Sequence, residues 1–478
     1  MSNSQNGFIS KVDNYFGITK SGSKFRTEII AGITTFMTMV YILMVNAGMF
    51  QVVNGGYYGA AYIATAIGAI VGTLLMAFLA KMPLAQASGM GINAFICFSL
   101  VGSSGISYAN AMMFTLLDGV IFLILTVTGL RKKIFDAIPS AVRKAIGIGI
   151  GLFIAFIGFQ NAGIVVHDDA TLVKFFSLNL LSSGTTFMGI MPGIVAIIGV
   201  IFIAVLSKKK VKGAILWGIL GSAVLYYIAV VIAKFAGNAD AAAVLGGISL
   251  DNPFAAFGDW ANVSAGKVFT EGFSFAGFTG TTGGLILLIA TTALSLCMID
   301  MFDTIGTLYG ACSKGNLLDA NGTPINMNKS MLADAIATCA GAVAGTSTVT
   351  TFVESSSGVA AGGKTGFTAL VTGICFILAM FLSPIAQLIP SCATAAALVW
   401  VGVLMMSSVG KIDWEDPAEA IVAFFTMIIM CLGYSINKGI GIGILVYIAI
   451  KLFTGKVKEI SIPTWVIGAI YLATFFLT

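Results

Sequence analysis

The chain has 478 residues, of which 58% are hydrophobic and only 9% are charged, and its mean hydropathy is +0.99. Soluble domains carry about 25% charged residues, so this composition excludes a soluble globular protein and indicates an all-α protein that crosses a membrane several times. The net charge of +5 comes from bases in short loops rather than from one broad basic surface, so no nucleic-acid partner is expected.

The apolar runs predict about fourteen transmembrane segments, because a bilayer core of ~30 Å takes about 20 apolar residues of helix. Twelve runs are long: 28–50, 57–80, 107–130, 141–160, 187–206, 212–236, 283–312, 328–345, 364–383, 386–409, 417–433 and 437–454. Two more, 88–103 and 354–363, are short and interrupted by small residues. A further run, 461–477, either spans the membrane or lies at its surface. The connections 161–186 and 238–282 are long enough for short surface helices.

The distribution of lysine and arginine predicts the orientation, because short cytoplasmic loops carry an excess of these residues. The bases expected on the cytoplasmic side are Arg131, Lys132, Lys133, Lys208, Lys209, Lys210, Lys212, Lys314, Lys329, Lys411, Lys456 and Lys458. The connection 238–282 has one lysine, Lys267, against four acids and is expected outside. The polar N-terminal segment does not resemble a cleavable signal peptide. We therefore expect a multi-pass protein of the inner or plasma membrane with a cytoplasmic N-terminus.

Two short matches indicate an inverted repeat of seven plus seven segments. Ile138-Pro139-Ser140 corresponds to Ile389-Pro390-Ser391, and Lys212-Gly213 corresponds to Lys438-Gly439, in the same order and on opposite predicted faces of the membrane. The two short segments are then the third in each half. Paired short segments broken by Gly or Pro mark the midplane site of many transporters. The β-branched run 348–353 predicts a short extended piece before each half-helix.

The stretch Gly345–Gly366 is polar, rich in glycine and flanked by apolar runs, and it contains one carboxylate, Glu354. Such a stretch persists at membrane depth only where it is buried in protein or lines a cavity. Glu354 precedes Ser355 and Ser356 at the start of the predicted half-helix, where free amides favour an acceptor-rich ligand. Its carboxylate can accept two N–H groups from the edge of a heterocycle. The alternative is a simple helix cap.

Asp300 and Asp303 lie three residues apart and therefore on one helical face, which Thr304 and Thr307 extend. Two buried carboxylates so close disfavour each other's ionisation, so at least one is expected to carry a proton near neutral pH. That property suits a proton-coupled carrier. The alternative is a structural pair hydrogen-bonded to neighbouring helices.

Three further polar residues lie in apolar segments. Asn93, in the first short segment, can read a carbonyl and an N–H together or can bridge two helices. Asp118 has no polar neighbours in the sequence, which favours a packing or gating partner over a ligand contact. Asp334 is expected near a helix start, where the helix dipole is enough to stabilise it.

Other sequence signals are weak. Gly358–Thr365 matches the pattern G-x-x-x-x-G-K-[ST], but a nucleotide loop needs a parallel sheet behind it, and the flanking spans leave none. Lys364 is therefore expected in a cytoplasmic loop. His167-Asp168-Asp169 predicts a solvated loop rather than a metal site. The seven cysteines lack a C-x-x-C pair, and we expect no enzyme activity and no cofactor other than a coupling proton.

Four stretches together resemble the AzgA-like purine-permease branch of the nucleobase–ascorbate transporter superfamily. They are a run from Arg26 to Leu43 that reads RTEIIAGITTFMTMVYIL, then Gly89–Phe95, Asp300–Leu308 and Gly345–Ser355. Two positions depart from the family pattern: Ser88 stands where proline is expected, and Asp118 stands where many relatives have Glu. The resemblance covers nearly the whole chain.

The resemblance implies fourteen helices in two inverted repeats, with a core domain that moves against a gate domain. The chain then divides into a cytoplasmic segment, core, gate, outer connection, core and gate, at 1–27, 28–130, 131–240, 241–282, 283–385 and 386–478.

The resemblance also implies proton-coupled import of guanine, hypoxanthine or adenine, often by a homodimer. Asp300 and Glu354 would bind the purine with help from Thr304, Ser355 and Ser356, while Asn93 orients the first half-helix and Phe95 or Phe352 stacks on the base. Asp303, Asp300, Glu354 and Asp118 are the candidates for proton coupling. A related carrier of xanthine, uracil or a small anion is the alternative.

Overall fold

The computed structural model describes residues 2–103, 106–129, 138–179, 186–248, 252–275, 278, 281–320 and 322–477. In the first half of the chain the helices and strands are α1 (Ser2–Phe16), α2 (Phe25–Met39), α3 (Tyr41–Phe50), α4 (Tyr58–Leu75), η1 (Met76–Ala80), β1 (Gln86–Ser88), α5 (Met90–Ala94), η2 (Phe95–Ser103), α6 (Tyr108–Thr128), α8 (Ser140–Asn161), β2 (Val165–Asp168), β3 (Leu172–Phe175), α9 (Phe187–Lys208) and α10 (Ala214–Phe235). The bases Arg131, Lys132 and Lys133 lie outside the described residues.

The remaining elements begin with three short helices in the long connection, α11 (Ala239–Gly246), α12 (Ala255–Val263) and α13 (Lys267–Thr270). They continue with α14 (Thr282–Lys314), α15 (Met327–Ala344), β4 (Val349–Thr351), α16 (Ser355–Ala360), α17 (Gly366–Ala379), η3 (Met380–Leu382), α18 (Ser383–Gln387), α19 (Ser391–Met405), η4 (Met406–Lys411), α20 (Pro417–Leu432), α21 (Ile436–Phe453), η5 (Val457–Glu459) and α22 (Ile462–Leu477). The prediction of short surface helices within 238–282 is confirmed.

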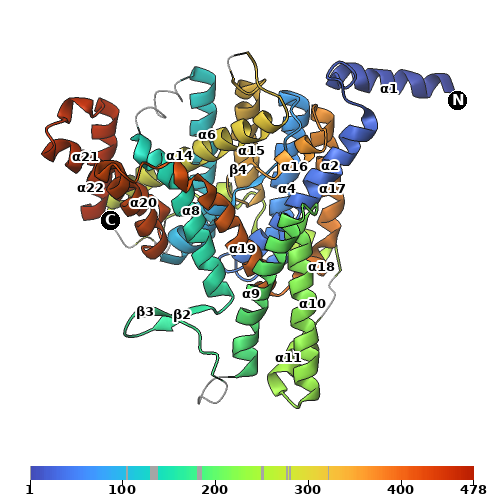
Figure 1. The fold of residues 1–478 in the computed structure, drawn as a ribbon, viewed down its shortest axis with the longest axis horizontal. Helices are drawn as coiled ribbons and strands as arrows, with labels where there is room; N and C mark the ends of the chain where they lie inside the picture. The colour runs from blue at the N-terminus through green and yellow to red at the C-terminus, as the bar shows by residue number, and fades with distance from the viewer. Residues whose placement is uncertain are drawn as a thin grey trace.

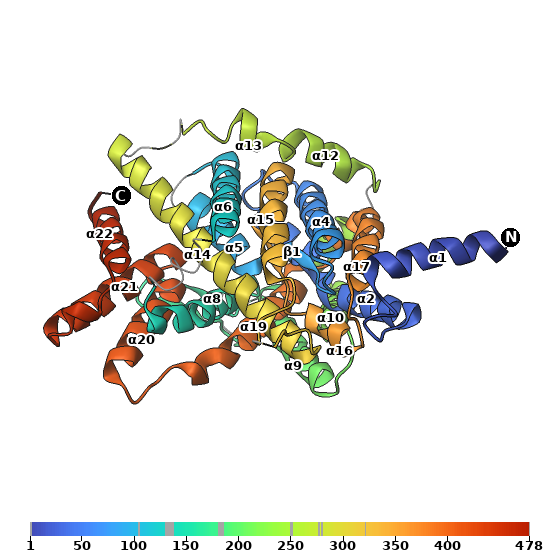
Figure 2. The same ribbon diagram turned by 90° about the horizontal axis from the view of Figure 1, so that it is seen from above.

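Among the described residues, ten helices are long and apolar enough to cross a membrane. This confirms a multi-pass membrane protein. Ten such helices are fewer than the fourteen predicted segments, so the length and composition of the helices do not by themselves establish that number. The two broken segments are short, α20 is also short, and α15 carries Lys329 in its first turn and Asp334 further along. Figures 1 and 2 show α1 at one end of the long axis of the molecule and the last helices, α20 to α22, at the other.

The connection 161–186 is long enough for a short surface helix, but the structure shows strands between Val165 and Phe175. The described part of it forms the antiparallel hairpin β2–β3 instead. Its strands contain β-branched residues, and its turn is closed by the Asp168 carboxylate, which accepts the N–H groups of Ala170 and Thr171 at 3.1 and 3.0 Å. An aspartate that binds the backbone two and three residues ahead stabilises a turn and competes with helix.

Small residues let the central helices approach closely. Helix α15 packs against α6 and α4, and its contact with α6 uses glycine. A β-carbon at Gly119 of α6 would lie 2.9 Å from the backbone nitrogen of Cys339. Gly345 ends α15 with a φ of +91°, and a β-carbon there would lie 2.6 Å from the Tyr108 hydroxyl. The chain can therefore turn from α15 into β4 at the centre of the bundle.

The C-terminal segment 461–477 forms helix α22, which packs against α14 and α21. Its Tyr471 is almost fully buried, and the tyrosine hydroxyl lies 2.6 Å from the Ser295 hydroxyl on α14. Ser295 also donates to Asn437 of α21 at 2.7 Å. The last helix is therefore an integral part of the bundle rather than a detached surface helix.

We expect Gly358→Ala to destabilise the protein. A β-carbon at Gly358 of α16 would lie 2.0 Å from the hydroxyl oxygen of Thr35 and 2.6 Å from the backbone oxygen of Ala31. Overpacking of this kind costs about 1–3 kcal/mol, so the thermal unfolding temperature in detergent should fall. Gly147→Ala is the matched control, because a β-carbon there meets nothing within 4 Å. Equal unfolding temperatures for the two variants would contradict the close packing of α16 on α2.

Candidate functional site

The two broken segments meet at the centre of the molecule. Strand β1 pairs with β4 in antiparallel register, with Gln86 opposite Thr351 and Ser88 opposite Val349, and all six strand residues are buried. Helix α5 follows β1, and α16 begins shortly after β4. This confirms the predicted extended piece before each half-helix. The pairing brings the starts of the two half-helices into one place.

Glu354 precedes the first residue of α16 and does not cap the helix with its side chain. Its carboxylate Oε1 accepts a hydrogen bond of 2.6 Å from the hydroxyl of Tyr41, the first residue of α3. The tyrosine is fully buried, whereas Glu354 is half-buried. The carboxylate is therefore held by one strong donor and is not sealed from solvent.

Asp300 and Asp303 lie on α14, which packs against β4 and α16. Positions three apart differ by about 60° around a helix axis. This difference places the two carboxylates in different surroundings, one exposed and one buried. Asp303 is exposed and accepts a hydrogen bond of 3.3 Å from the Thr350 hydroxyl. Asp300 is fully buried, and in the described part of the chain no donor group reaches either of its oxygens. The two acids therefore share a helix face but only Asp303 reaches the open side.

Asp334 belongs to the same cluster, so the explanation by a helix dipole at a helix start is wrong. It is the eighth residue of α15, and the dipole effect is confined to the first turn. Its carboxylate is fully buried and accepts hydrogen bonds from Gln86 at 2.7 Å, Thr304 at 2.5 Å and Thr351 at 3.4 Å. Asp334 therefore joins β1, β4 and α14 through one carboxyl group.

Asp334, Asp118 and Asp303 all act electrostatically on Asp300. Carboxylates repel one another when they are charged, which disfavours the ionisation of all of them at once. The cluster therefore brings three buried carboxyl groups, those of Asp118, Asp300 and Asp334, together with the exposed Asp303.

Asp118 is also buried and has a polar partner that its sequence neighbours did not reveal. Its Oδ2 accepts a hydrogen bond of 2.8 Å from the hydroxyl of Thr348, the residue before β4. Its other oxygen has no partner among the described residues. This contact joins α6 to the centre of the site and agrees with a packing role.

Asn93 is bound by protein groups on both sides of its amide. Its oxygen accepts from the Ser88 hydroxyl at 2.8 Å and from the Ser347 hydroxyl, and its nitrogen donates to Asn46 of α3 at 2.5 Å. Thr346 completes the cluster by donating to Ser88 at 3.0 Å. Asn93 therefore fixes α5 against α3 and the chain entering β4. Ser88, the departure from the expected proline, supplies a hydrogen bond that a proline could not.

Five other predicted site residues face the protein interior. Thr304 uses its hydroxyl for Asp334, and Ser355 accepts the backbone N–H of Ala85 at 2.9 Å. The exposed fractions of Phe95 and Phe352 are 1% and 8%, and Ser356 is also buried. Phe352 directly follows β4, between Thr350, which contacts Asp303, and Glu354. Of the two aromatic residues, Phe352 is the one whose chain neighbours include Glu354 and the Thr350 partner of Asp303.

The segment Gly358–Thr365 binds a carboxylate of the protein itself. Glu28 of α2 is fully buried, and it accepts the backbone N–H groups of Lys364 and Thr365 at 3.0 and 3.3 Å. The hydroxyls of Thr365 and Thr368 also donate to it, at 2.9 and 2.6 Å. In this segment, which matches the sequence pattern of a phosphate-binding loop, the backbone N–H groups of Lys364 and Thr365 are therefore already bound to the carboxylate of Glu28.

Over the residues that the structure describes, no group of three or more His, Cys, Asp or Glu side chains could hold a metal ion. His167 is exposed and contacts the Asp169 carboxylate at 3.0 Å. Within the described part of the chain, the donors that hold the carboxyl groups of Asp118, Asp303, Asp334 and Glu354 are hydroxyl and amide groups.

The fold and the buried polar site define a multi-pass membrane protein of a transporter architecture. The transmembrane domain of the cyanobacterial bicarbonate transporter BicA is similar, with a TM-score of 0.57 and 15% identity, over 85% of this chain and 95% of that one. The murine Solute Carrier 26 family member A9 anion transporter is also similar, with a TM-score of 0.59 and 12% identity, over 93% of this chain and 72% of that one. At these identities the likeness shows the fold alone.

The chain belongs to a permease family, whose model (Xan_ur_permease, "Permease family") matches residues 26–442. It is 38% identical to the guanine/hypoxanthine permease PbuO of Bacillus subtilis, over 95% of this chain and 98% of the relative. It is 35% identical to the adenine permease AdeQ of Escherichia coli, over 98% of each chain. A putative permease of Methanocaldococcus jannaschii is 38% identical over 97% of this chain and 98% of the relative. Membership of a permease family makes the chain a transporter and not an enzyme, as the sequence predicts.

Glu28→Ala is expected to destabilise the protein more than Glu28→Gln. Alanine leaves two backbone N–H groups and two hydroxyls without their acceptor, and each buried unsatisfied group costs about 1–3 kcal/mol. Glutamine keeps one acceptor oxygen, so the fall in thermal unfolding temperature should be smaller. Glu415→Gln, in an exposed loop, is the control and should unfold as wild type does. Unfolding of Glu28→Ala at the wild-type temperature would contradict the role of this carboxylate.

Proposed function

We propose that this permease imports purine nucleobases (guanine, hypoxanthine or adenine) together with protons. Two of its relatives, a guanine/hypoxanthine permease and an adenine permease, support this substrate class. The relatives match nearly the whole chain, so the comparison includes both broken segments and α14. A related carrier of another nucleobase remains the alternative within the same family.

The observation that carries the proposal is the accessible pair of carboxylates beside the paired strands. Asp303 is exposed, Glu354 is half-buried, and the two act on each other electrostatically. A purine presents several N–H donors along one planar edge, and ionised carboxylates are strong acceptors for such donors. In this proposal Asp303 and Glu354 read the N–H edge while Phe352 contacts the face of the base. Asp300 and Thr304 are fully buried in this conformation, so in this proposal they support the site from the protein interior and do not contact the base directly.

We assign the coupling proton to the Asp300–Asp334 pair. Both carboxyl groups are buried, Asp300 on α14 and Asp334 on α15, and Asp334 acts electrostatically on Asp300. Two buried carboxylates that repel each other favour a state in which one of them carries a proton. Thr304 and Gln86 hold Asp334 in place at 2.5 and 2.7 Å. Gain or loss of this proton would change the hydrogen bonds that join α14 to the paired strands. Asp118 extends the acidic cluster toward α6.

We propose an elevator-like mechanism in which a core domain moves against a gate domain. The core consists of 28–130 and 283–385, and the gate of 131–240 and 386–478. Packing supports this division, because α15 packs on α6 and α4, and α17 on α2, whereas α8 packs on α19 and α20, and α9 on α10. At one crossing between the two sets, a β-carbon at Gly91 of α5 would lie 2.4 Å from a side-chain carbon of Ile150 on α8. A glycine there lets the two surfaces lie close.

The inverted repeat of seven plus seven segments belongs to the same proposal. The antiparallel pairing of β1 with β4, each followed by a short helix, is what two halves of opposite orientation require. We place the N-terminus in the cytoplasm on the basis of the lysine distribution. A homodimer stays a prediction, and exposed apolar side chains of α9 and α10, such as Ile201 and Ile232, are available to lipid or to a second copy.

Uptake by intact cells tests the substrate and the coupling. Cells that lack endogenous purine uptake and express the chain should accumulate labelled guanine, hypoxanthine or adenine, and a proton uncoupler should abolish the accumulation. Unlabelled uracil is the control competitor and should compete weakly. Accumulation of uracil in place of purines would favour the alternative substrate. Purine accumulation that is the same with and without the uncoupler would refute proton symport.

Two variants separate substrate binding from proton coupling. Glu354→Gln removes an ionised acceptor, and hydrogen bonds to charged groups are worth about 1.5–3 kcal/mol, so uptake and purine exchange should both fall about tenfold or more. Asp334→Asn keeps the shape but cannot hold the proton, so purine exchange should persist while accumulation against a gradient is lost.

Both variants must reach the membrane at wild-type abundance, with Glu415→Gln as the control. Full activity of Glu354→Gln would remove it from the site. Uncoupler-sensitive accumulation by Asp334→Asn at the wild-type level would remove the Asp300–Asp334 pair from coupling.

A further inference from the structure

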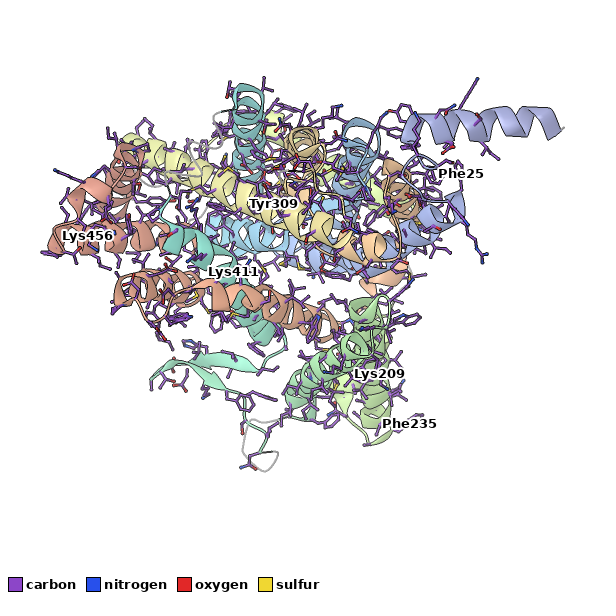
Figure 3. The ribbon with its side chains drawn as sticks, turned by 45° about the horizontal axis from the view of Figure 1, so that its top comes forward. Phe25, Lys209, Phe235, Tyr309, Lys411 and Lys456 are labelled. Atoms are coloured by element: carbon purple, nitrogen blue, oxygen red, sulfur yellow. The ribbon has the colours of Figure 1, made fainter. Side chains whose placement is uncertain are left out.

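An apolar cavity of about 620 Å³ lies far from the site, where α1 meets the bundle. One wall comes from a single face of α1, because its residues are spaced three and four apart. The other walls come from η1 and α17, and Phe25, the first residue of α2, also lines the cavity; Figure 3 labels this residue. The apolar residues that line these walls include Ile9, Val12, Phe16, Phe78, Phe367 and Leu370.

Specific contacts hold α1 at this position. The Tyr15 hydroxyl donates to the backbone oxygen of Phe78 at 3.2 Å. The Lys81 ammonium donates to the backbone oxygen of Tyr15 at 3.0 Å and lies 4.1 Å from the centre of the tyrosine ring. The ring of Phe16 packs against those of Phe78 and Phe367, with centroids 5.8 and 5.7 Å apart. The cavity is therefore built into the fold rather than left by a loose terminus.

The orientation of α1 is that of a helix at a membrane surface. In both Figure 1 and Figure 2, α1 runs across the direction of α4 and α17 and projects from their side. Interfacial helices lie in this way, with an apolar face toward the acyl chains. The adjoining surfaces of α2 and α17 expose Ile29, Ile33 and Leu378. The cavity is thus bordered by the exposed apolar surface of two helices that belong to candidate membrane spans.

The charge around the cavity is positive. Residues 1–27 contain four bases, Lys11, Lys20, Lys24 and Arg26, and one acid, Asp13. Asp13 is occupied by the Thr19 backbone N–H and hydroxyl at 2.8 and 2.7 Å. Lys11 itself lines the cavity. A ligand that fits has a long apolar portion and a negatively charged head.

We propose that this cavity binds an anionic phospholipid. One acyl chain fills the space between α1 and the wall formed by η1 and α17, and the phosphate group lies near Lys11 and the other bases of the N-terminal segment. The bound lipid would fasten α1 to α17, the helix that follows the loop held by Glu28. The proposal does not depend on which substrate the permease carries.

Lipid binding to the purified full-length protein tests the proposal. Native mass spectrometry in detergent would titrate phosphatidylglycerol and phosphatidylcholine with identical acyl chains, and the anionic lipid should bind more tightly. Each lysine near an anionic lipid contributes about fivefold in affinity, so Lys11→Gln with Lys24→Gln should weaken phosphatidylglycerol binding about 25-fold. Lys456→Gln with Lys458→Gln is the matched control, because Lys456 lies at the other end of the molecule from Phe25 (Figure 3).

A second variant tests the cavity rather than the charge. Leu370→Trp fills the space with a larger side chain, so phosphatidylglycerol binding should fall while the thermal unfolding temperature stays near that of wild type. Equal binding of the two lipids by the wild-type protein would overturn the proposal. An equal loss in the control lysine variant, or wild-type binding by Leu370→Trp, would also overturn it.

Discussion

The structure depends on the hydrogen bonding of an irregular backbone inside a membrane protein. Water is scarce at that depth, so each main-chain N–H and carbonyl of a broken helix needs a partner from the protein. Strands β1 and β4 meet this requirement by pairing with each other, although more than 260 residues separate Gln86 from Thr351. The remaining groups at the start of β1 are bound by Ser355, whose hydroxyl contacts both the N–H and the carbonyl of Ala85. The position of both half-helices follows from this pairing.

The same strand organises the acids of the site. Thr348, Thr350 and Thr351 donate in turn to Asp118, Asp303 and Asp334, which come from three different helices. The backbone of β4 is used for pairing with β1, while its hydroxyls are free to hold carboxyl groups. A short threonine-rich strand therefore supplies both the scaffold and the donors. Any movement of β4 would change the environment of all three acids together, which supports a link between the proton and the substrate.

Local signals predicted the parts of this site but not its assembly. Glycine, proline and β-branched residues marked both broken segments, and the spacing of Asp300 and Asp303 placed them on one face of α14. The partners of these residues come from distant positions in the chain, and neither spacing nor composition encodes that Tyr41 meets Glu354 or that Gln86 meets Asp334. From the sequence alone, the stability of Asp334 is attributed to a helix dipole because the local sequence places this residue near an expected helix start. A buried carboxylate inside a span carries a stronger signal than its distance from a helix start.

The charge of the site argues against an anion as the cargo. Five acids, Asp118, Asp300, Asp303, Asp334 and Glu354, lie around the paired strands, and their partners among the described residues are neutral hydroxyl and amide groups. An anion entering this space would meet unpaired negative charge, whose repulsion is strong where water is scarce. A neutral heterocycle rich in N–H groups would instead supply hydrogen-bond donors that the carboxylates lack. The fold permits either kind of cargo, so it is the identity of these side chains that favours the nucleobase.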